Sequence, residues 1–425
     1  MAAIRPFRAL RFSADAGSLN ALVAPPYDVL SPAEREDYAA RSPHNIVHLT
    51  LPEQHPDDRS KYVKYARSAA RLAEWRREGT LALEESPSIY RYTQSFWLPG
   101  IEEAFVRTSL VTLIKVEPYE KGIVLPHEQT FPKHKEDRLR ILEATRAHLE
   151  CIYGLFEDPS GEVLKALREA PAGSAAEVEM DGVQNELEPI TDAAAVARLV
   201  GLLADKKVWI ADGHHRYETA WAFRQSVGEK DGEVPEDYMM MALSSMSDPG
   251  LVLLPTHRML KGFPLSRQQT VARLEELFHA EEHNSRRIVD LIAGAHARGV
   301  RAFGAVFPGG ISYLLTPKDE AELLSRNNYE GSDDLKKLDV TLLHNVILEN
   351  LLGVKGLDSV SYTRDPHEAI READQGGIDV AFLMNPPSVG DMKRIAMGGE
   401  KMPQKSTYYY PKLTSGLLLW SLNDF

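Results

Sequence analysis

The chain has 425 residues, of which 43% are hydrophobic and 26% charged, and its net charge is −13 at pH 7. This composition is typical of a folded protein of two or three domains, and the negative charge argues against nucleic acid or an anionic membrane as the main partner. Cys151 is the single cysteine, which excludes a disulfide framework and a thiolate metal cage. The early charges and the lack of a long apolar run predict a cytoplasmic protein without a signal peptide or membrane span.

Residues 1–87 are expected to form an N-terminal α/β segment. In APPYDVLSPAERE, Ser31, Pro32 and Glu34 have the spacing of a capped helix start, and the Tyr-Asp pair of APPYDV suits a turn. The alternation in NIVHLTLP, residues 45–52, predicts a strand. A charged helix is predicted from about residue 58 to 77, before Gly79.

Residues 88–235 are expected to form a second domain. Aromatic and β-branched runs over 89–97 and 104–116 predict paired strands, followed by a helix over 136–149 and a strand over 151–156. The polar composition that follows predicts a peripheral insertion at 157–200. A third domain, 236–425, alternates strand and helix patterns toward its end, which favours an α/β layer. The predicted fold class is therefore mixed α/β and α+β.

The strongest candidate site is VWIADGHHRYETA, residues 208–220. Val208 to Ile210 suit a buried strand, Gly213 allows a sharp turn, and the spacing from Arg216 onward is helical. A strand that leads into a helix start brings backbone N–H groups, the positive end of the helix dipole and basic side chains to one place, which suits phosphate. A tight turn with exposed histidines is the structural alternative.

Two further segments carry clustered charges. In LPHEQTFPKHKEDR, His127 and Glu128 precede several cations, among them Arg138, so that a carboxylate general base could act beside groups that hold an anionic substrate. A solvated loop before a helix is the alternative interpretation. In KMPQKSTYYYPK, Lys405, Ser406 and Lys412 offer donors to phosphate or carboxylate, although a core strand fringed by lysines explains the pattern equally well.

Several common nucleotide and hydrolase motifs are absent from the sequence. There is no Gly-Lys dipeptide for a P-loop, no Gly-x-Gly for a dinucleotide fold and no Gly-x-Ser-x-Gly elbow. His127-Glu128 begins like a zinc-protease helix, but Phe131 stands where the second ligand belongs.

The segment Asp212 to Arg216 resembles the ParB/sulfiredoxin superfamily, whose free-serine kinases carry Asp-Gly-His-His-Arg at a strand–helix junction that binds nucleotide phosphates. The whole chain is similar to a prokaryotic family of unknown function with APPYDV, a His-Glu loop, ADGHHR and MPQKSTYYYPK. The resemblance implies a ParB/sulfiredoxin-like core, phosphate contacts from Gly213, His214, His215 and Arg216, and a general base from an earlier loop, for which Glu128 is the candidate. His214 stands in the place of the sulfiredoxin cysteine, which argues against sulfinic acid reduction.

Together these observations predict a phosphotransferase that uses ATP or ADP and acts on a small hydroxylated metabolite, free serine being one candidate. Asp212 would hold a Mg²⁺ ion or orient a histidine, His214 would contribute to catalysis, and His127, Arg138, Lys405, Ser406 and Lys412 would bind substrate. A non-catalytic nucleotide sensor and a phosphohydrolase are the alternatives. The oligomeric state is left open, a homodimer included.

Overall fold

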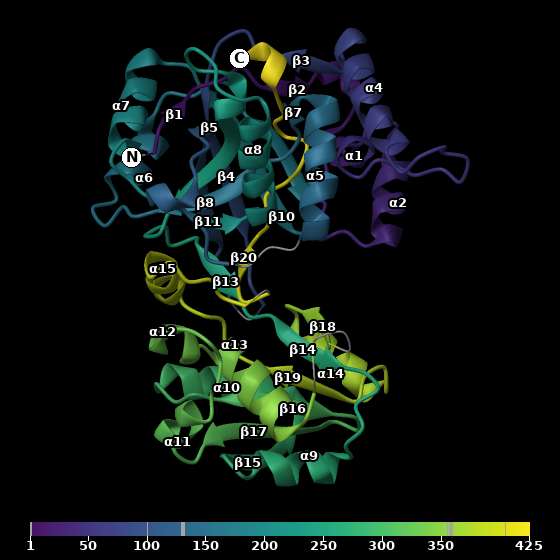
Figure 1. Ribbon diagram of the computed structural model, residues 1–425, viewed down its shortest axis with the longest axis vertical. Coiled ribbons are helices and arrows are strands. Elements are labelled where there is room, and N and C mark those ends of the chain that lie inside the picture. Colours follow the sequence, from purple (N-terminus) through teal and green to yellow (C-terminus); the bar gives the residue numbers. More distant parts are fainter. Residues whose placement is uncertain (1, 100, 129–131, 355, 357–359, 404) are drawn as a thin grey trace. The chain divides into compact units, whose positions relative to one another are not determined.

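The computed structural model describes residues 2–99, 101–128, 132–354, 356, 360–403 and 405–425. Contacts divide the chain into two compact units (Figure 1). Unit 1 comprises Met1–Pro126, Thr130–Val252 and Pro411–Phe425, and unit 2 comprises His127–Gln129 and Leu253–Tyr410. Helices and strands alternate irregularly in both units, so the mixed α/β fold class predicted from the sequence is confirmed.

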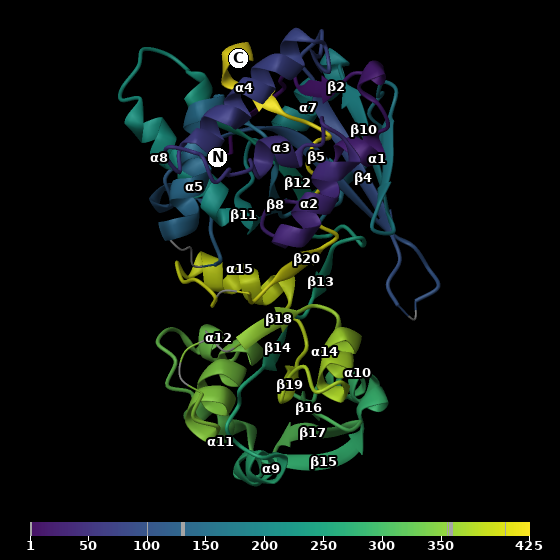
Figure 2. The same cartoon turned by 90° about the vertical axis from the view of Figure 1, so that its right-hand side faces the viewer.

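A nine-stranded mixed sheet forms the centre of unit 1. Its strand order is β6-β11-β8-β12-β5-β4-β10-β9, and β1 pairs with β5. The β6–β11 and β8–β12 pairs are parallel, and the other pairs are antiparallel. The strands are β1 (Ile4–Arg5), β4 (Ile89–Phe96), β5 (Phe105–Lys115), β6 (Val124–Leu125), β8 (Ile152–Phe156), β9 (Ala176–Met180), β10 (Val183–Ile190), β11 (Val208–Asp212) and β12 (Tyr238–Ser245). Figure 2 shows β4 and β5 continuing beyond the sheet as a hairpin.

Helices pack against this sheet and form much of the rest of unit 1. Leu167, Leu199 and Tyr217, from α6, α7 and α8, pack with Ile152 and Val208 of the sheet in one apolar core. The described helices of unit 1 are α1 (Leu19–Leu22), α2 (Pro32–Arg41), α3 (Val47–Thr50), α4 (Val63–Arg77), α5 (Pro132–Thr145), α6 (Glu162–Glu169), α7 (Ala193–Leu203) and α8 (His214–Ser226), with 3₁₀ turns η1 (Ala14–Ala16), η2 (Tyr119–Lys121), η3 (Pro235–Asp237) and η6 (Leu422–Asp424). The predicted cap of α2 is confirmed, because Ser31 Oγ accepts from Glu34 N at 3.3 Å.

Two stretches of unit 1 differ from the sequence-based expectation. The strand predicted over residues 45–52 is wrong: the segment forms α3, because Asn45 Oδ1 accepts from Val47 N and its Nδ2 donates to two backbone carbonyls, which favours a helix start. Residues 157–200, expected to be peripheral, contain α6, β9, β10 and most of α7. Seven residues of β10 are paired in register with β4, so this segment extends the central sheet.

The segment after residue 410 runs back through unit 1. Leu419 exchanges two backbone hydrogen bonds with Leu10, at 2.8 and 3.0 Å, and Ser415 does the same with Ala24. β21 (Trp420–Ser421) then pairs with β7 (Ala147–His148), and β2 (Leu10–Phe12) pairs with β3 (Leu81–Leu83). The last fifteen residues therefore connect strand β2, the segment that follows α1 and β7 of the same unit.

Unit 2 contains a six-stranded sheet in the order β15-β17-β16-β19-β14-β18. All of its described pairs are antiparallel, so the strand–helix alternation does not produce a parallel layer here. Ile288 and Ile292 of α10 and Ala369 and Ala373 of α14 pack against one face of the sheet. No helix in the described part of either unit is long and apolar enough to cross a membrane.

The strands of unit 2 are β14 (His257–Leu260), β15 (Phe278–Asn284), β16 (Phe303–Phe307), β17 (Ile311–Pro317), β18 (Val360–Thr363), β19 (Val380–Leu383) and β20 (Tyr408–Tyr410), and β13 (Val252–Leu254) marks the passage from unit 1. Its helices are α9 (Arg267–Leu274), α10 (Ile288–Ala297), α11 (Glu320–Ser325), α12 (Asp333–Lys336), α13 (Asp339–Thr341), α14 (Pro366–Asp374) and α15 (Val389–Met397), with a 3₁₀ turn η4 (Ser285–Arg287) and a π-helix η5 (Leu342–Leu351).

The predicted division at residues 87/88 and 235/236 stays a prediction about folding domains. The pairing of β12 with β5 and β8 includes residues 238–245 in the sheet of unit 1. By its contacts, this part of unit 1 ends at Val252. The composition change near residue 230 coincides with an exposed loop between α8 and η3 rather than with the end of unit 1.

Candidate functional site

The segment VWIADGHHR forms the strand–turn–helix junction that its pattern predicts. β11 is buried from Val208 to Ala211, and its register with β8 shifts between Ile210 and Asp212, so a local bulge precedes the turn. Gly213 has φ +94°, a conformation that L side chains rarely adopt. The position has no room either, because a Cβ there would lie 2.5 Å from Ile152 Cγ2. The junction therefore requires glycine for two independent reasons.

The start of α8 follows directly from Gly213. Tyr217 N donates to Gly213 O at 3.0 Å, which closes the first helical turn. Among the described residues no side chain caps this helix start, and the first N–H groups of a helix have no acceptor within the helix itself. His214 is buried, whereas His215 and Arg216 are half-buried. The first turn of α8 therefore combines the positive end of a helix dipole with three basic residues.

Asp212, the last residue of β11, is paired with Lys412. Lys412 Nζ lies 2.9 Å from Asp212 Oδ2, and both side chains are largely buried. Burial would raise the pKa of the Asp212 carboxyl, but the cations of Lys412 and Arg216 outweigh it and hold this pKa well below its usual range. Two segments separated by 200 positions, both singled out from the sequence, thus meet in unit 1.

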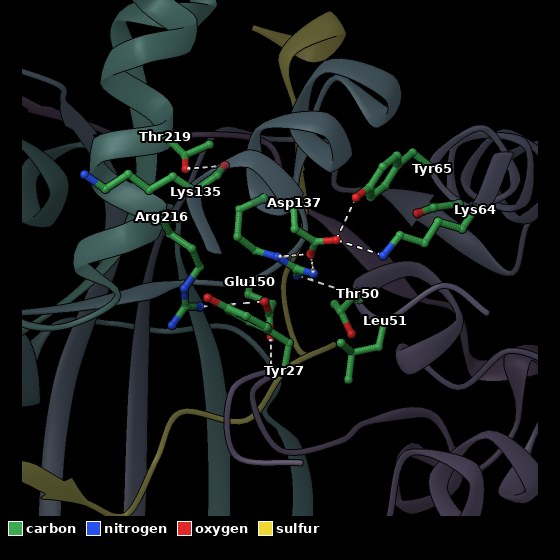
Figure 3. Close-up of polar contacts among 12 residues, drawn as sticks. Tyr27, Thr50, Leu51, Lys64, Tyr65, Lys135, Asp137, Glu150, Arg216 and Thr219 are labelled. Carbon is green, nitrogen blue, oxygen red and sulfur yellow. Dashed lines mark hydrogen bonds and ion pairs between the residues drawn. The ribbon is translucent and has the colours of Figure 1, made fainter. Parts of the chain in front are cut away.

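Arg216 is directed toward Glu150 and Tyr27 (Figure 3). Its Nη1 donates to Cys151 O at 2.8 Å and lies 3.8 Å from Glu150 Oε2, and its guanidinium lies 5.6 Å from the centre of the Tyr27 ring. Burial disfavours the charge, but Glu150 and further acidic neighbours raise the pKa of Arg216 above its ordinary value. Its Nε is buried without a hydrogen-bond partner among the described residues.

Arg138 approaches the other side of the same network. Its guanidinium lies 3.9 Å from the centre of the Tyr27 ring, its Nη1 donates to Thr50 O at 2.9 Å, and it forms an ion pair with Asp137. Burial raises the pKa of Tyr27 above its usual range, so the phenol stays protonated. The APPYDV tyrosine is thus bound to both arginines by cation–π contacts, a role that the turn interpretation did not anticipate.

A small cavity of about 50 Å³ lies beside these groups. Arg138, His148, Glu150, Arg216 and Thr219 contribute its polar lining. A volume of this size holds a few water molecules, since one water needs roughly 10–15 Å³ of such space. It is too small for a nucleotide, which would have to bind outside it.

The His-Glu loop and the segment 401–407 meet in unit 2. His127 O accepts from Met402 N at 2.7 Å, and His127 Nε2 lies 2.8 Å from Thr407 Oγ1. The Glu128 carboxylate accepts from the backbone N–H of Lys405 at 2.8 Å. Two segments that the sequence marks separately as candidate sites therefore form one cluster. Residues 129–131 of the loop, the side chains of 132–134 and residue 404 lie outside what the structure describes.

Arg258 completes this cluster and was not predicted. It is fully buried in β14, its Nη2 donates to Lys405 O at 3.2 Å, and its Nε donates to His344 Nε2 at 2.9 Å in the π-helix η5. Lys405 itself has φ +57°, which is uncommon for a residue other than glycine. Burial lowers the pKa of Arg258 to about 10 and that of His344 to about 3, so the histidine stays a neutral acceptor. A lone arginine in the short strand HRML gave no sequence signal for this role.

The predicted site residues thus separate into two groups. Asp212 to Arg216, Arg138 and Lys412 belong to unit 1, whereas His127, Glu128, Lys405 and Ser406 belong to unit 2. Ser406 Oγ donates to Pro403 O within its own turn. The contacts within each unit do not join Glu128 to Asp212, so a shared role of these two residues stays a prediction.

The assignment of Asp212 to a Mg²⁺ ion also stays a prediction. Its described partner is the Lys412 ammonium, which contacts the oxygen Oδ2. In the part of the chain that the structure describes, no three His, Cys, Asp or Glu side chains gather into a metal site. The charges around Asp212 are cationic, which suits the oxygens of a phosphate group.

Fold and site together define a mixed α/β protein with a glycine-led strand–helix junction surrounded by buried charges. The chain belongs to a family of proteins of unknown function (DUF1015), whose model matches residues 4–341. No curated protein matches the chain.

Solved structures with partial likeness include a free serine kinase in complex with ADP, with 15% identity, a TM-score of 0.36 and coverage of 70% of this chain and 87% of that chain. A conserved hypothetical protein from Pyrococcus furiosus is 14% identical, with a TM-score of 0.36 and coverage of 74% and 97%. SbnI with a C-terminal truncation from Staphylococcus aureus is 12% identical, with a TM-score of 0.35 and coverage of 72% and 86%. TM-scores of this size carry no statement about activity.

Proposed function

We propose that the protein is a nucleotide-dependent phosphotransferase that acts on a small hydroxylated metabolite, and that the β11–α8 junction binds the nucleotide phosphates. The observation that carries the proposal is the junction itself: a glycine that tolerates no side chain, followed by a helix start that no described side chain caps. Backbone N–H groups at such a helix start bind anions, and the dipole favours negative charge there.

The charges around the junction support a phosphate ligand. Lys412 and Arg216 lie near Asp212, and His214 and His215 occupy the first helical turn. Phosphoryl transfer depends mainly on positioning and on neutralising the charge of the transferred group, so fixed cations at this place suit the reaction. The sequence resemblance of Asp212–Arg216 to the free-serine kinases supports the same assignment, including a ParB/sulfiredoxin-like core.

Glu128 is the proposed general base. Its carboxylate is oriented by the Lys405 N–H, and the buried Arg258 lies near enough to influence it electrostatically. In this role Glu128 takes the hydroxyl proton of the acceptor as the new O–P bond forms, while the O–P bond that joins the terminal phosphoryl group to the nucleotide breaks and the shortened nucleotide leaves with the electron pair. Lys405 and the neighbouring Ser406 are proposed to contact the acceptor, and free serine is one acceptor of this type. Mg²⁺, if it takes part, would bind through nucleotide phosphates and Asp212, as carboxylate-plus-phosphate sites do.

Calorimetric titration with ADP and ATP, each with and without Mg²⁺, tests the nucleotide site. Arg216→Ala is expected to weaken binding by roughly tenfold or more, because a charge-assisted phosphate contact contributes about 1.5–3 kcal/mol. Arg224→Ala, in the last turn of the same helix, is the matched control and should keep the parental affinity. If Arg216→Ala does not fold, the half-buried His215→Ala replaces it. Equal affinity of parent and variant would overturn the assignment.

The same titrations separate the alternative functions. A kinase binds a hydroxylated metabolite more tightly in the presence of nucleotide, whereas a sensor binds nucleotide without any such enhancement. Release of phosphate from nucleotide without a metabolite would instead identify a phosphohydrolase.

A further inference from the structure

The chain segment that carries Lys412 is held by buried polar side chains of the central sheet. Arg107 Nη2 donates to Pro411 O at 2.6 Å, and Gln94 Nε2 donates to Lys412 O at 3.0 Å. Thr414 Oγ1 donates to Asn185 Oδ1 at 3.0 Å. Two of these hydrogen bonds hold the backbone carbonyls of residues 411 and 412, and the third holds the side chain of Thr414, so the chain is fixed on both sides of Lys412.

The three sheet residues occupy one row across neighbouring strands. Gln94 of β4 is paired in register with Arg107 of β5 and with Asn185 of β10. Gln94 Oε1 accepts from Arg107, and Gln94 Nε2 donates to Asn185 Oδ1 at 3.0 Å. Exposed fractions of 0%, 1% and 2% for Arg107, Gln94 and Asn185 show that the row is buried.

Burying such a row is costly unless it meets defined partners. An arginine needs at least one acceptor outside the row, and the carbonyl of Pro411 supplies it. Tyr92, two residues from Gln94 on the same strand face, adds a second contact, because its hydroxyl accepts from Thr414 N at 3.2 Å and donates to Asn185 Oδ1 at 2.6 Å. The row therefore selects one backbone path for residues 411–414, and this path brings the Lys412 ammonium to Asp212.

We propose that Arg107, Gln94 and Asn185 are positioning residues that hold Lys412 against Asp212 and so complete the phosphate site at the β11–α8 junction. The proposal rests on the proposed function for the role of the site, but the positioning itself is a property of the protein without ligand. None of the three residues has to touch a ligand for this role.

The test measures the ionisation of Asp212 directly. Carboxyl ¹³C chemical shifts of aspartate-labelled protein are followed with pH, and Asp212→Asn identifies the resonance. Lys412→Met removes the cation, so the Asp212 pKa should rise, and the size of this rise is the reference for the other variants. Arg216 and His214 still face Asp212 in Lys412→Met. Gln94→Met keeps the side-chain length, deletes the donor to Lys412 O, and is expected to give at least about half of that rise.

Ser109→Ala is the matched control. It removes a buried hydrogen bond to Ser244, 2.7 Å long, in the same sheet, and Ser109 forms no hydrogen bond with the described residues 411–414, so the Asp212 pKa should stay at the parental value. If Gln94→Met does not fold, Thr414→Val removes only the hydroxyl that bonds Asn185. An unchanged Asp212 pKa in the folded row variant, or in Lys412→Met, would overturn the positioning role.

Titration of the same variants with ADP separates the two proposals. Positioning together with a phosphate site predicts roughly tenfold weaker ADP binding in Gln94→Met and parental binding in Ser109→Ala. A raised Asp212 pKa with no ADP binding in any protein, the parent included, would support the positioning role and contradict the nucleotide assignment. Parental ADP affinity despite a raised pKa would remove Lys412 from the binding site.

Discussion

Gly213 lies so close to Ile152 that a Cβ at position 213 would come within 2.5 Å of Ile152 Cγ2. We therefore predict that Gly213→Ala lowers the free energy of unfolding by about 2–4 kcal/mol, because a positive φ and a steric overlap add together. Urea unfolding measures this effect. The matched control is Gly201→Ala in the exposed part of α7, where no atom restricts a Cβ; it should be neutral or stabilise by about 0.5–1 kcal/mol. Equal stability of the two variants would contradict the prediction.

Glu128→Gln tests the general base. The amide keeps an oxygen that accepts from Lys405 N–H, so folding and nucleotide affinity should change little, whereas turnover should fall by about 10²–10⁴. Steady-state rates with the acceptor that the titrations identify provide the measurement. Glu128→Ala, which also removes the hydrogen bond, separates a catalytic role of Glu128 from a structural one. A loss of nucleotide binding in this variant alone would indicate a structural role. Parental turnover in Glu128→Gln would exclude Glu128 as the base.

The buried His257 and the half-buried His148 and His344 predict how stability depends on pH. Burial lowers the pKa of His148 to about 4 and those of His257 and His344 to about 3. Because the ordinary pKa is about 6.5, the unfolded chain binds these protons first, and stability falls as the pH drops from about 6.5 toward 4. Near pH 5 these three histidines should take up close to three protons on unfolding, and Asp339, whose pKa burial raises to about 6, should release about one, which gives a combined slope of about 3 kcal/mol per pH unit if both units unfold together.

Unfolding free energies between pH 7 and pH 4.5 measure this slope. His257→Asn should reduce the uptake by about one proton, since the asparagine Oδ1 takes the place of the ring Nδ1 that accepts from Met384 N but does not titrate. If the units unfold separately, unit 1 should take up about one proton, and unit 2 about two at its histidines less the one that Asp339 releases. A slope that His257→Asn leaves unchanged would contradict the prediction.

Limited proteolysis provides a fourth test. The stretch 228–233 between α8 and η3 is exposed throughout, whereas residues 176–190 form paired strands of the central sheet. Trypsin should therefore cut first after Lys230, and mass spectrometry of the early fragments identifies the site. Lys230→Gln should delay the first cut. Early cleavage after Arg198 or Lys165 would favour the peripheral insertion predicted from composition.

The sequence predicts those parts of the structure where local signals and burial agree. The cap at Ser31, the β4–β5 pair and the β11–α8 junction each follow from patterns within one continuous stretch of sequence. The sequence NIVHLT alternates like a strand, but it forms a helix. The Asn45 side chain donates to Ala21 O and accepts from Val47 N, and these bonds favour the helix start. The polar alternation of residues 183–190 conceals a strand whose inner face carries Asn185 instead of an apolar side chain.

The site shows the same limit. Asp212, Gly213 and Glu128 are visible as local patterns, but no pattern links Asp212 to Lys412 or Glu128 to Lys405. These pairs form because segments far apart in the sequence lie side by side in the fold. Arg107 and Arg258 are isolated cations within apolar runs, and only their buried carbonyl partners show why arginine is tolerated there.

Because residues 411–425 return to unit 1, this unit can complete its folding only at the end of synthesis. Arg76 and Ser421, which share a hydrogen bond, are 345 positions apart, and a ribosome that adds about 5–20 residues per second needs roughly 20–70 s to cover that distance. During this interval the first strands and helices have emerged but lack their final partners. Residues 253–410 can fold independently in the meantime. A product that stops before residue 411 contains the whole glycine junction yet has no lysine for Asp212, so only chains translated past this point can assemble the charged pair.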